Sequence, residues 1–77
     1  MQNLYKTKDL YLASYLVMHG LNLVQLEKQD KRFYFLFETT DNLKPLCDEF
    51  YARRAKVEPM EYVVAMKQVK SKMYNQG

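Results

Sequence analysis

Cysteine, glycine and proline are all scarce in this chain of 77 residues, and each scarcity excludes a class of protein. Cys47 is the only cysteine, so a disulfide-stabilised secreted mini-protein is excluded and a reducing compartment is favoured. The only glycines are Gly20 and Gly77, so there is no glycine-rich phosphate-binding loop. With two prolines and 48% hydrophobic residues, the composition is typical of a chain that folds, because disordered segments lack the apolar surface that offsets conformational entropy.

Side chains that carry catalysis or bind metal are also few. A zinc site needs about four Cys, His or acidic ligands, whereas this chain has one cysteine and one histidine. His19 precedes Gly20 and is typical of a helix end, while Cys47 falls among apolar positions, as a buried unreactive thiol does. Asp48 and Glu49 are adjacent and would point about 100° apart on a helix, which does not make an acid–base pair. We therefore predict that the protein is not an enzyme and has no metal or cofactor.

Long apolar runs and targeting segments are missing as well. The apolar run Leu10–Met18 is much shorter than the ~20 residues that cross a bilayer. The residues that follow it, His19-Gly20-Leu21-Asn22, are unlike the small residues of a signal-peptide cleavage site. We expect no membrane association and a cytoplasmic location.

The run Leu10–Met18 predicts a first helix. Thr7 is the expected N-cap with Asp9 in the first turn, and Gly20 fits the left-handed position that closes a helix. The expected inward stripe is Leu12, Ala13, Leu16 and Val17. Because this helix is apolar on nearly every side, we expect cover on more than one face, either from the last helix or from a second copy in a homodimer. The expected dimer interface is Leu10, Tyr11, Tyr15 and Met18.

Two segments predict a β-hairpin. Residues 21–27 alternate imperfectly, and residues 33–38 are aromatic with a period of two. The turn at residues 28–32 lacks glycine, which favours a loop longer than two residues. The core face is expected to carry Phe33, Phe35 and Phe37, and the opposite face Tyr34 and Leu36.

Two further helices are expected in the second half. Pro45 must lie in the first turn of one helix, which places its N-cap at Asp41 or Asn42. Pro59 opens the other helix, with Glu61 near its start. The expected apolar positions are Leu43, Leu46, Cys47 and Phe50 in the former helix, and Tyr62, Met66, Val69 and Met73 in the latter.

These elements predict one α+β domain over residues 1–77, with an ordered core of about 5–74 and frayed residues 75–77. The expected order is α-β-β-α-α, with a two-stranded antiparallel hairpin packed against helices.

Three segments together resemble a known family: the helix start at residues 6–13, the strand at residues 33–38 and the closing run at residues 66–74. They are similar to a family of short, uncharacterised domains encoded by bacteriophages and by mobile elements of bacteria, and the likeness spans most of the chain. The resemblance implies a phage or mobile-element origin, a bacterial host cell and a compact α+β fold. It implies no active site.

Basic residues are concentrated near the C-terminus. Residues 1–52 hold six basic and seven acidic side chains, and residues 53–77 hold six basic and two acidic ones, so the net charges are −1 and +4. This asymmetry favours an anionic partner such as DNA or RNA, bound through phosphates with limited sequence specificity. The alternative is a solvated surface that keeps a small protein soluble. The candidate cations are Arg53, Arg54, Lys56, Lys67, Lys70 and Lys72, with Tyr74 beside Lys67 and Lys70 on one helix face.

The hairpin is a second candidate surface. Lys31 and Arg32 lie beside Tyr34 on the face away from the core, and exposed aromatic residues flanked by cations stack unpaired bases, at about 1–3 kcal/mol per base. The alternative is that the last helix covers this face. We predict a non-enzymatic nucleic-acid-binding accessory protein. The alternative function is a protein–protein interaction module of phage or mobile-element origin that modulates a host or replication factor.

Overall fold

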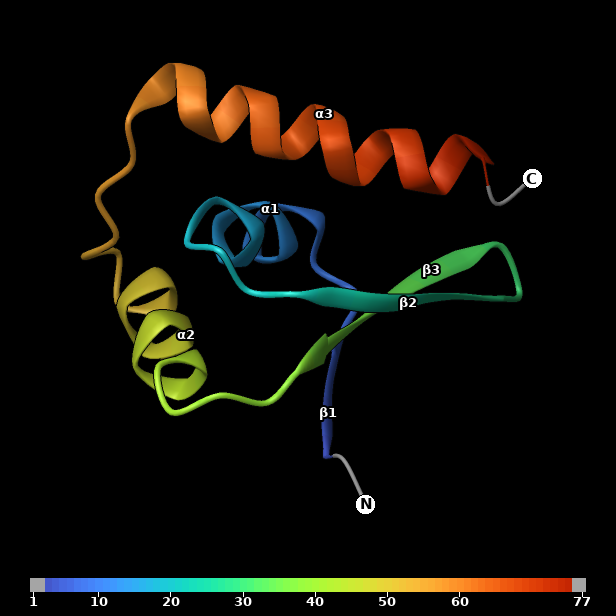
Figure 1. The fold of residues 1–77 in the computed structure, drawn as a ribbon, viewed down its shortest axis with the longest axis horizontal. Helices are drawn as coiled ribbons and strands as arrows, with labels where there is room; N and C mark the ends of the chain where they lie inside the picture. Colours follow the sequence, from blue (N-terminus) through green and yellow to red (C-terminus); the bar gives the residue numbers. More distant parts are fainter. Residues whose placement is uncertain (1–2, 76–77) are drawn as a thin grey trace.

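The computed structural model describes residues 3–75 as an α+β fold with a three-stranded antiparallel sheet (Figure 1). The elements in chain order are β1 (Leu4–Thr7), α1 (Leu10–Met18), β2 (Leu23–Gln29), β3 (Arg32–Glu38), α2 (Leu43–Tyr51) and α3 (Pro59–Asn75). The α+β class is confirmed, whereas the predicted order α-β-β-α-α lacked the first strand. Asn75 belongs to α3, and the fraying predicted for Gln76 and Gly77 lies outside the described residues.

Strand β1 turns the predicted hairpin into a sheet of order β1-β3-β2. Tyr5 lies opposite Phe37 and Thr7 opposite Phe35, so both face the core side of the sheet. Thr7 is buried and Tyr5 packs against the core, whereas Lys6 between them points the other way. A strand of four residues gives too few alternations to be recognised from its pattern.

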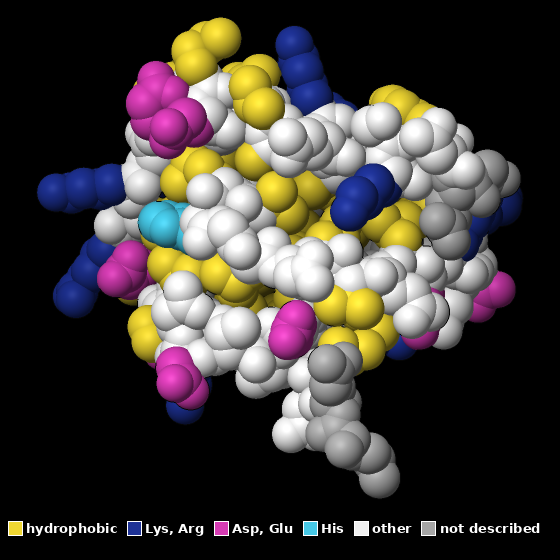
Figure 2. Space-filling model, viewed as in Figure 1, with side chains coloured by type: hydrophobic (Ala, Val, Ile, Leu, Met, Phe, Trp, Pro, Cys, Tyr) yellow, Lys and Arg dark blue, Asp and Glu magenta, His cyan; other side chains and the backbone are white. Residues whose placement is uncertain are grey.

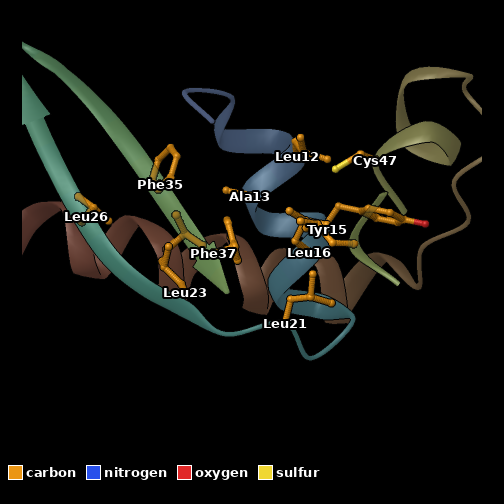
Figure 3. Close-up of a cluster of buried hydrophobic side chains, with 12 residues drawn as sticks. Leu12, Ala13, Tyr15, Leu16, Leu21, Leu23, Leu26, Phe35, Phe37 and Cys47 are labelled. Carbon is orange, nitrogen blue, oxygen red and sulfur yellow. The ribbon is translucent and has the colours of Figure 1, made fainter. Parts of the chain in front are cut away.

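The core lies on one face of this sheet. The aromatic face of β3 was predicted correctly, because Phe35 and Phe37 are almost fully buried. Leu12 and Leu16 of α1 and Val69 of α3 are fully buried against them, with α1 lying between α3 and the strands (Figures 1 and 3). α2 supplies Leu43 and Cys47 to the same cluster. All three helices therefore contribute to a single core on the Phe35 side.

The start of α1 is capped by a side chain, and a left-handed glycine lies just beyond its end. Asp9, not Thr7, is the N-cap: its Oδ1 accepts from the backbone N–H groups of Tyr11 at 2.9 Å and Leu12 at 3.2 Å. Thr7 is instead the last residue of β1, and its Oγ1 accepts from the N–H of Asp9 at 3.1 Å. At the other end, Gly20 has the predicted left-handed conformation, with φ of 84°.

The turn between β2 and β3 has two residues, so the longer loop predicted for residues 28–32 was wrong. Gln29 lies opposite Arg32, and both central residues have positive φ, 50° for Asp30 and 71° for Lys31. This is the backbone of a type I′ turn, whose twist matches that of the paired strands. Strand pairing therefore imposes the turn even on Lys31, a residue that seldom adopts positive φ.

The last two helices begin where they were predicted to begin. α2 follows Asn42 and contains Pro45 in its first turn, and α3 starts at Pro59. The Glu58 side chain caps α3, since its Oε2 accepts from the N–H of Glu61 at 2.6 Å. Residues 52–58 join the two helices and contain Arg53 at φ of 61°.

Candidate functional site

The C-terminal cations form two separate groups, not one patch. Arg53, Arg54 and Lys56 lie in the loop before α3, whereas Lys67, Lys70 and Lys72 lie in the second half of that helix. At about 1.5 Å per residue, Lys72 is roughly 20 Å along the helix from Pro59. Figure 1 places the loop and the C-terminal end of α3 at opposite ends of the molecule, and Figure 2 shows Lys and Arg side chains standing apart from one another.

The structure instead brings the second half of α3 to the β2–β3 hairpin (Figure 1). Met73 of α3 and Phe33 of β3 both pack against the edge of the core. Lys72 and Asn75 line a shallow hollow together with Gln25 and its neighbours in β2. We call this part of the molecule the hairpin end. Its cations and exposed tyrosine are Lys28, Lys31, Arg32, Lys70, Lys72 and Tyr74.

Acidic residues are sparse at the hairpin end. Asp30 is the only acid among residues 28–32, and α3 has none after Glu61. Arg32 lines a further hollow with Lys8, where the nearby carboxylate of Asp9 is engaged in capping α1. Positive charge is therefore more concentrated at the hairpin end than the net charge of +3 for the whole chain indicates.

Accessibility varies among these side chains. Tyr74 is 77% exposed, and Lys31, Arg32 and Lys72 are exposed, while Lys70 is half-buried. Lys67 is exposed near the middle of α3, and it shares the solvent side with Tyr74 as the helical spacing predicted. Lys28 was missed in the sequence. It lies opposite Phe33 in the sheet, with its Nζ 5.6 Å from the centroid of the Phe33 ring. Its position just before the basic turn could have identified it as a member of this group of cations.

Tyr34 lies on the sheet face opposite the core, as predicted. The alternative, that α3 covers this face, was wrong, because α3 packs against α1 on the core side. Within residues 3–75, the side chains beside Tyr34 come from the neighbouring strands. Lys6 Nζ lies 4.6 Å from the centre of the Tyr34 ring and 3.3 Å from Glu27 Oε1. The Tyr34 ring is therefore half-buried beneath an ion pair, and a base would have to displace Lys6 to stack on it.

The first-helix dimer interface is not available as a whole. Tyr15 is 1% exposed (Figure 3). Its ring lies 5.5 Å from that of Phe50 in α2, and its hydroxyl lies 3.4 Å from Glu49 Oε2. Burial and the Glu49 carboxylate both raise the pKa of Tyr15. Leu10 packs against the core, whereas Tyr11 is 59% exposed and Met18 is half-buried. The periodicity of α1 alone could not show that α2 and α3 cover its remaining sides.

The single cysteine is buried, as predicted. Cys47 of α2 lies against Tyr5 of β1, and the two side chains share a hydrogen bond. Burial raises the pKa of the Cys47 thiol, and burial together with this hydrogen bond raises the pKa of Tyr5 to about 12. The neutral thiol is a weak nucleophile.

Residues 3–75 contain neither a cluster of metal ligands nor a helix that could span a membrane. In this part of the chain, no three His, Cys, Asp or Glu side chains lie close enough to hold one metal ion. The helices of the same residues include none with the length and apolar content needed to cross a membrane.

The geometry defines a small α+β domain with a helix-covered three-stranded sheet and a basic hairpin end. Residues 2–75 match the model of a family described as a domain of unknown function, DUF5659, and the chain belongs to this family. No curated protein and no solved structure matches the chain.

Proposed function

We propose that this chain is a non-enzymatic nucleic-acid-binding protein that contacts phosphates through the hairpin end. The observation that supports the proposal is that two basic segments distant in sequence lie at the same end of the molecule. The turn with Lys31 and Arg32 lies at the same end of the molecule as Lys70 and Lys72 of α3 (Figure 1). Cations gathered on one end neutralise several phosphates together and release their counterions, which is the main source of sequence-independent affinity.

The side chains at this end favour weak sequence specificity. Lysine and arginine contact phosphates, whereas base-specific contacts in grooves usually need Asn, Gln or a bidentate arginine on a fixed element. Gln68 of α3 is exposed but lies on a different side of the helix from Lys67 and Tyr74. The highly exposed ring of Tyr74 supplies a surface on which an unpaired base can stack.

Fluorescence anisotropy with short labelled DNA and RNA tests the proposal. We expect binding at low salt. The logarithm of the binding constant should fall linearly with the logarithm of the salt concentration, with a slope of about 0.7 to 0.9 per neutralised phosphate. The double variant Arg32→Glu, Lys72→Glu, which takes one exposed cation from each segment, should bind about tenfold or more weakly and lower the salt slope by about 2.

The loop before α3 offers a matched control with the same change in charge. In the variant Arg54→Glu, Lys56→Glu, both exposed cations are reversed at the opposite end of the molecule. At about 0.1 M salt, affinity should then change by no more than about threefold, because charges beyond ~10 Å are largely screened at that concentration. Absence of binding at low salt, or an equal loss in both double variants, would refute the hairpin end as the site.

The origin and the location of the protein belong to the same proposal. The resemblance to phage and mobile-element domains favours a gene carried by such an element and a protein acting in the cytoplasm of the bacterial host. Genes of related function cluster in phage genomes, so the neighbours of this gene test the idea. A position among housekeeping genes in unrelated genomes would argue against it.

A further inference from the structure

Strand β3 extends beyond its partner β1, which leaves one edge of the hairpin open. β1 pairs with β3 only as far as Thr7, which lies opposite Phe35. The chain then turns into α1, and the hairpin continues past this point (Figure 1). Within the described part of the chain, residues 32–34 therefore pair with β2 on one side and with no strand on the other.

The backbone of Phe33 points toward this open edge. The residues that flank a two-residue hairpin turn, here Gln29 and Arg32, exchange both of their backbone hydrogen bonds. Alternation along the strand then directs the N–H and C=O groups of Phe33 away from β2. The hydrogen bond from the N–H of Thr39 to the C=O of Asn3 agrees with this alternation, because Thr39 is six residues further along and bonds on the β1 side. The N–H of Phe33 is thus a hydrogen-bond donor directed at the open edge.

Two cations lie at the same edge. Lys8 and Arg32 are exposed, and they line an open hollow of about 520 Å³ together with Asp9 and Phe33. Neither cation forms a salt bridge with another residue of the described chain. Outward-facing N–H groups at a sheet edge form concavities that bind anions, and lysine and arginine add charge-assisted hydrogen bonds to an anionic oxygen.

Asp9 is the only acid among the residues that line the hollow, and its carboxylate already has partners. Its Oδ1 accepts from the backbone N–H groups of Tyr11 and Leu12, and its Oδ2 lies 3.5 Å from the hydroxyl of Tyr51. These donors compensate much of its negative charge. The hollow therefore combines two free cations with one carboxylate that is engaged elsewhere, and it favours an anion.

We propose that this hollow holds one phosphate group of the bound nucleic-acid strand, an inference that rests on the proposed function. Lys8 and Arg32 contact the phosphate oxygens, and the N–H of Phe33 donates to one of them. The hollow is larger than a phosphate group and leaves room for the attached sugar. Lys8 is thereby a further phosphate-binding residue, contributed by the segment between β1 and α1.

Amide chemical shifts of the isotope-labelled full chain test the backbone contact. When a short single-stranded DNA is added, the amide proton of Phe33 should move downfield, because its N–H gains a phosphate oxygen as acceptor. The amide of Tyr34 is the internal control and should move much less, since the alternation directs it at Glu27 of β2. Inorganic phosphate alone should move the Phe33 amide in the same direction, at a much higher concentration.

A charge-removing variant tests the contribution of Lys8. Lys8→Gln should weaken DNA binding by about threefold or more and lower the salt slope by about 1, because one phosphate contact is lost. The exposure of Lys8 makes a folding defect unexpected. Lys44→Gln is the matched control and should keep the wild-type slope, because Lys44 is also exposed and lies beside Leu4 at the other end of β1.

The outcomes separate this inference from the proposed function. If DNA binds while the Phe33 amide responds to neither ligand, or if Lys8→Gln keeps the wild-type slope, the hollow is not a phosphate site and the proposed function stands. If no DNA binds at low salt, the proposed function fails and this inference fails with it. A Phe33 amide that responds to inorganic phosphate but not to DNA would assign the hollow to a small phosphate compound and overturn the contact with a nucleic-acid strand.

Discussion

The start of α1 shows how the choice between two suitable capping residues depends on tertiary structure. Thr7 and Asp9 are both good N-cap types, and they are separated by one residue. The strand pairing of Thr7 with Phe35 extends the backbone up to Thr7 and leaves Asp9 as the first residue able to cap. The existence of α1 and its Gly20 terminus followed from local chemistry, whereas the cap depended on a strand that the pattern had not revealed.

Gly20 provides a prediction at this scale. Replacing it with alanine should destabilise the protein by about 1–2 kcal/mol, because a residue with a Cβ is strained in the left-handed region. An added Cβ would meet no atom within 4 Å, so this cost comes from the backbone alone. Gly20→Asn should lose less, since asparagine tolerates this region better. Urea unfolding measures the free energy of unfolding of both variants. An alanine variant as stable as the wild type would contradict the left-handed conformation of residue 20.

Among the elements, the β2–β3 hairpin was predicted with its core face but with the wrong turn. Alternation of aromatic residues identifies a half-buried strand locally. The turn geometry, in contrast, is set by the register that pairs Gln29 with Arg32, and register depends on which face each strand buries. Strand β1 was missed for a related reason, since its four residues become a strand only by pairing with β3.

Lys31 gives a prediction for this element that separates stability from binding. Lys31→Gly should raise the free energy of unfolding by about 0.5–1 kcal/mol, because glycine adopts the φ of 71° without strain. The same change removes an exposed cation from the hairpin end, so affinity for nucleic acid should fall by a few-fold. Lys31→Ala is the control, since it loses the charge and keeps the strain. Urea unfolding of the wild type and both variants measures the free energy of unfolding, and fluorescence anisotropy measures their affinity for nucleic acid. A glycine variant less stable than the alanine variant would be inconsistent with the type I′ turn.

For the whole molecule, the sum of charges could be read from the sequence but their distribution in space could not. The six cations after residue 52 are split by the length of α3, and two of them, Lys70 and Lys72, belong to the hairpin end instead of lying near Arg53. Met73 of α3 and Phe33 of β3 both pack against the core, and no spacing within the chain indicates that their segments lie at the same end of the molecule (Figure 1). The exposure of Met60, Val63 and Val64 on α3 could not be predicted for a similar reason. This helix has apolar residues on two sides, and only the structure shows which side is buried against the core.

Stability at alkaline pH is a property of the whole molecule, because tyrosines from several elements pack against the core. Burial, and then the hydrogen bond with Cys47, raise the pKa of Tyr5 from 10.0 to about 12, and burial is also the first cause of the raised pKa of Tyr15 and Tyr62. The folded protein therefore holds these protons more tightly than the unfolded chain does. For Tyr5, this contribution to stability is complete below pH 10 and is lost as the pH rises through about 12.

Comparison with Tyr5→Phe isolates one of these groups, because the two proteins differ only in the hydroxyl of residue 5. Below pH 9, the difference in unfolding free energy between the variant and the wild type should be constant. Between pH 10 and 12, it should shift in favour of phenylalanine by at most about 1.4 kcal/mol per pH unit, since only the wild type has a hydroxyl at this position to deprotonate. Urea unfolding at a series of pH values provides the measurement. A difference that stays flat up to pH 12 would mean that the Tyr5 hydroxyl titrates alike in the folded and unfolded chains, and that the contact between β1 and α2 does not shield it from water.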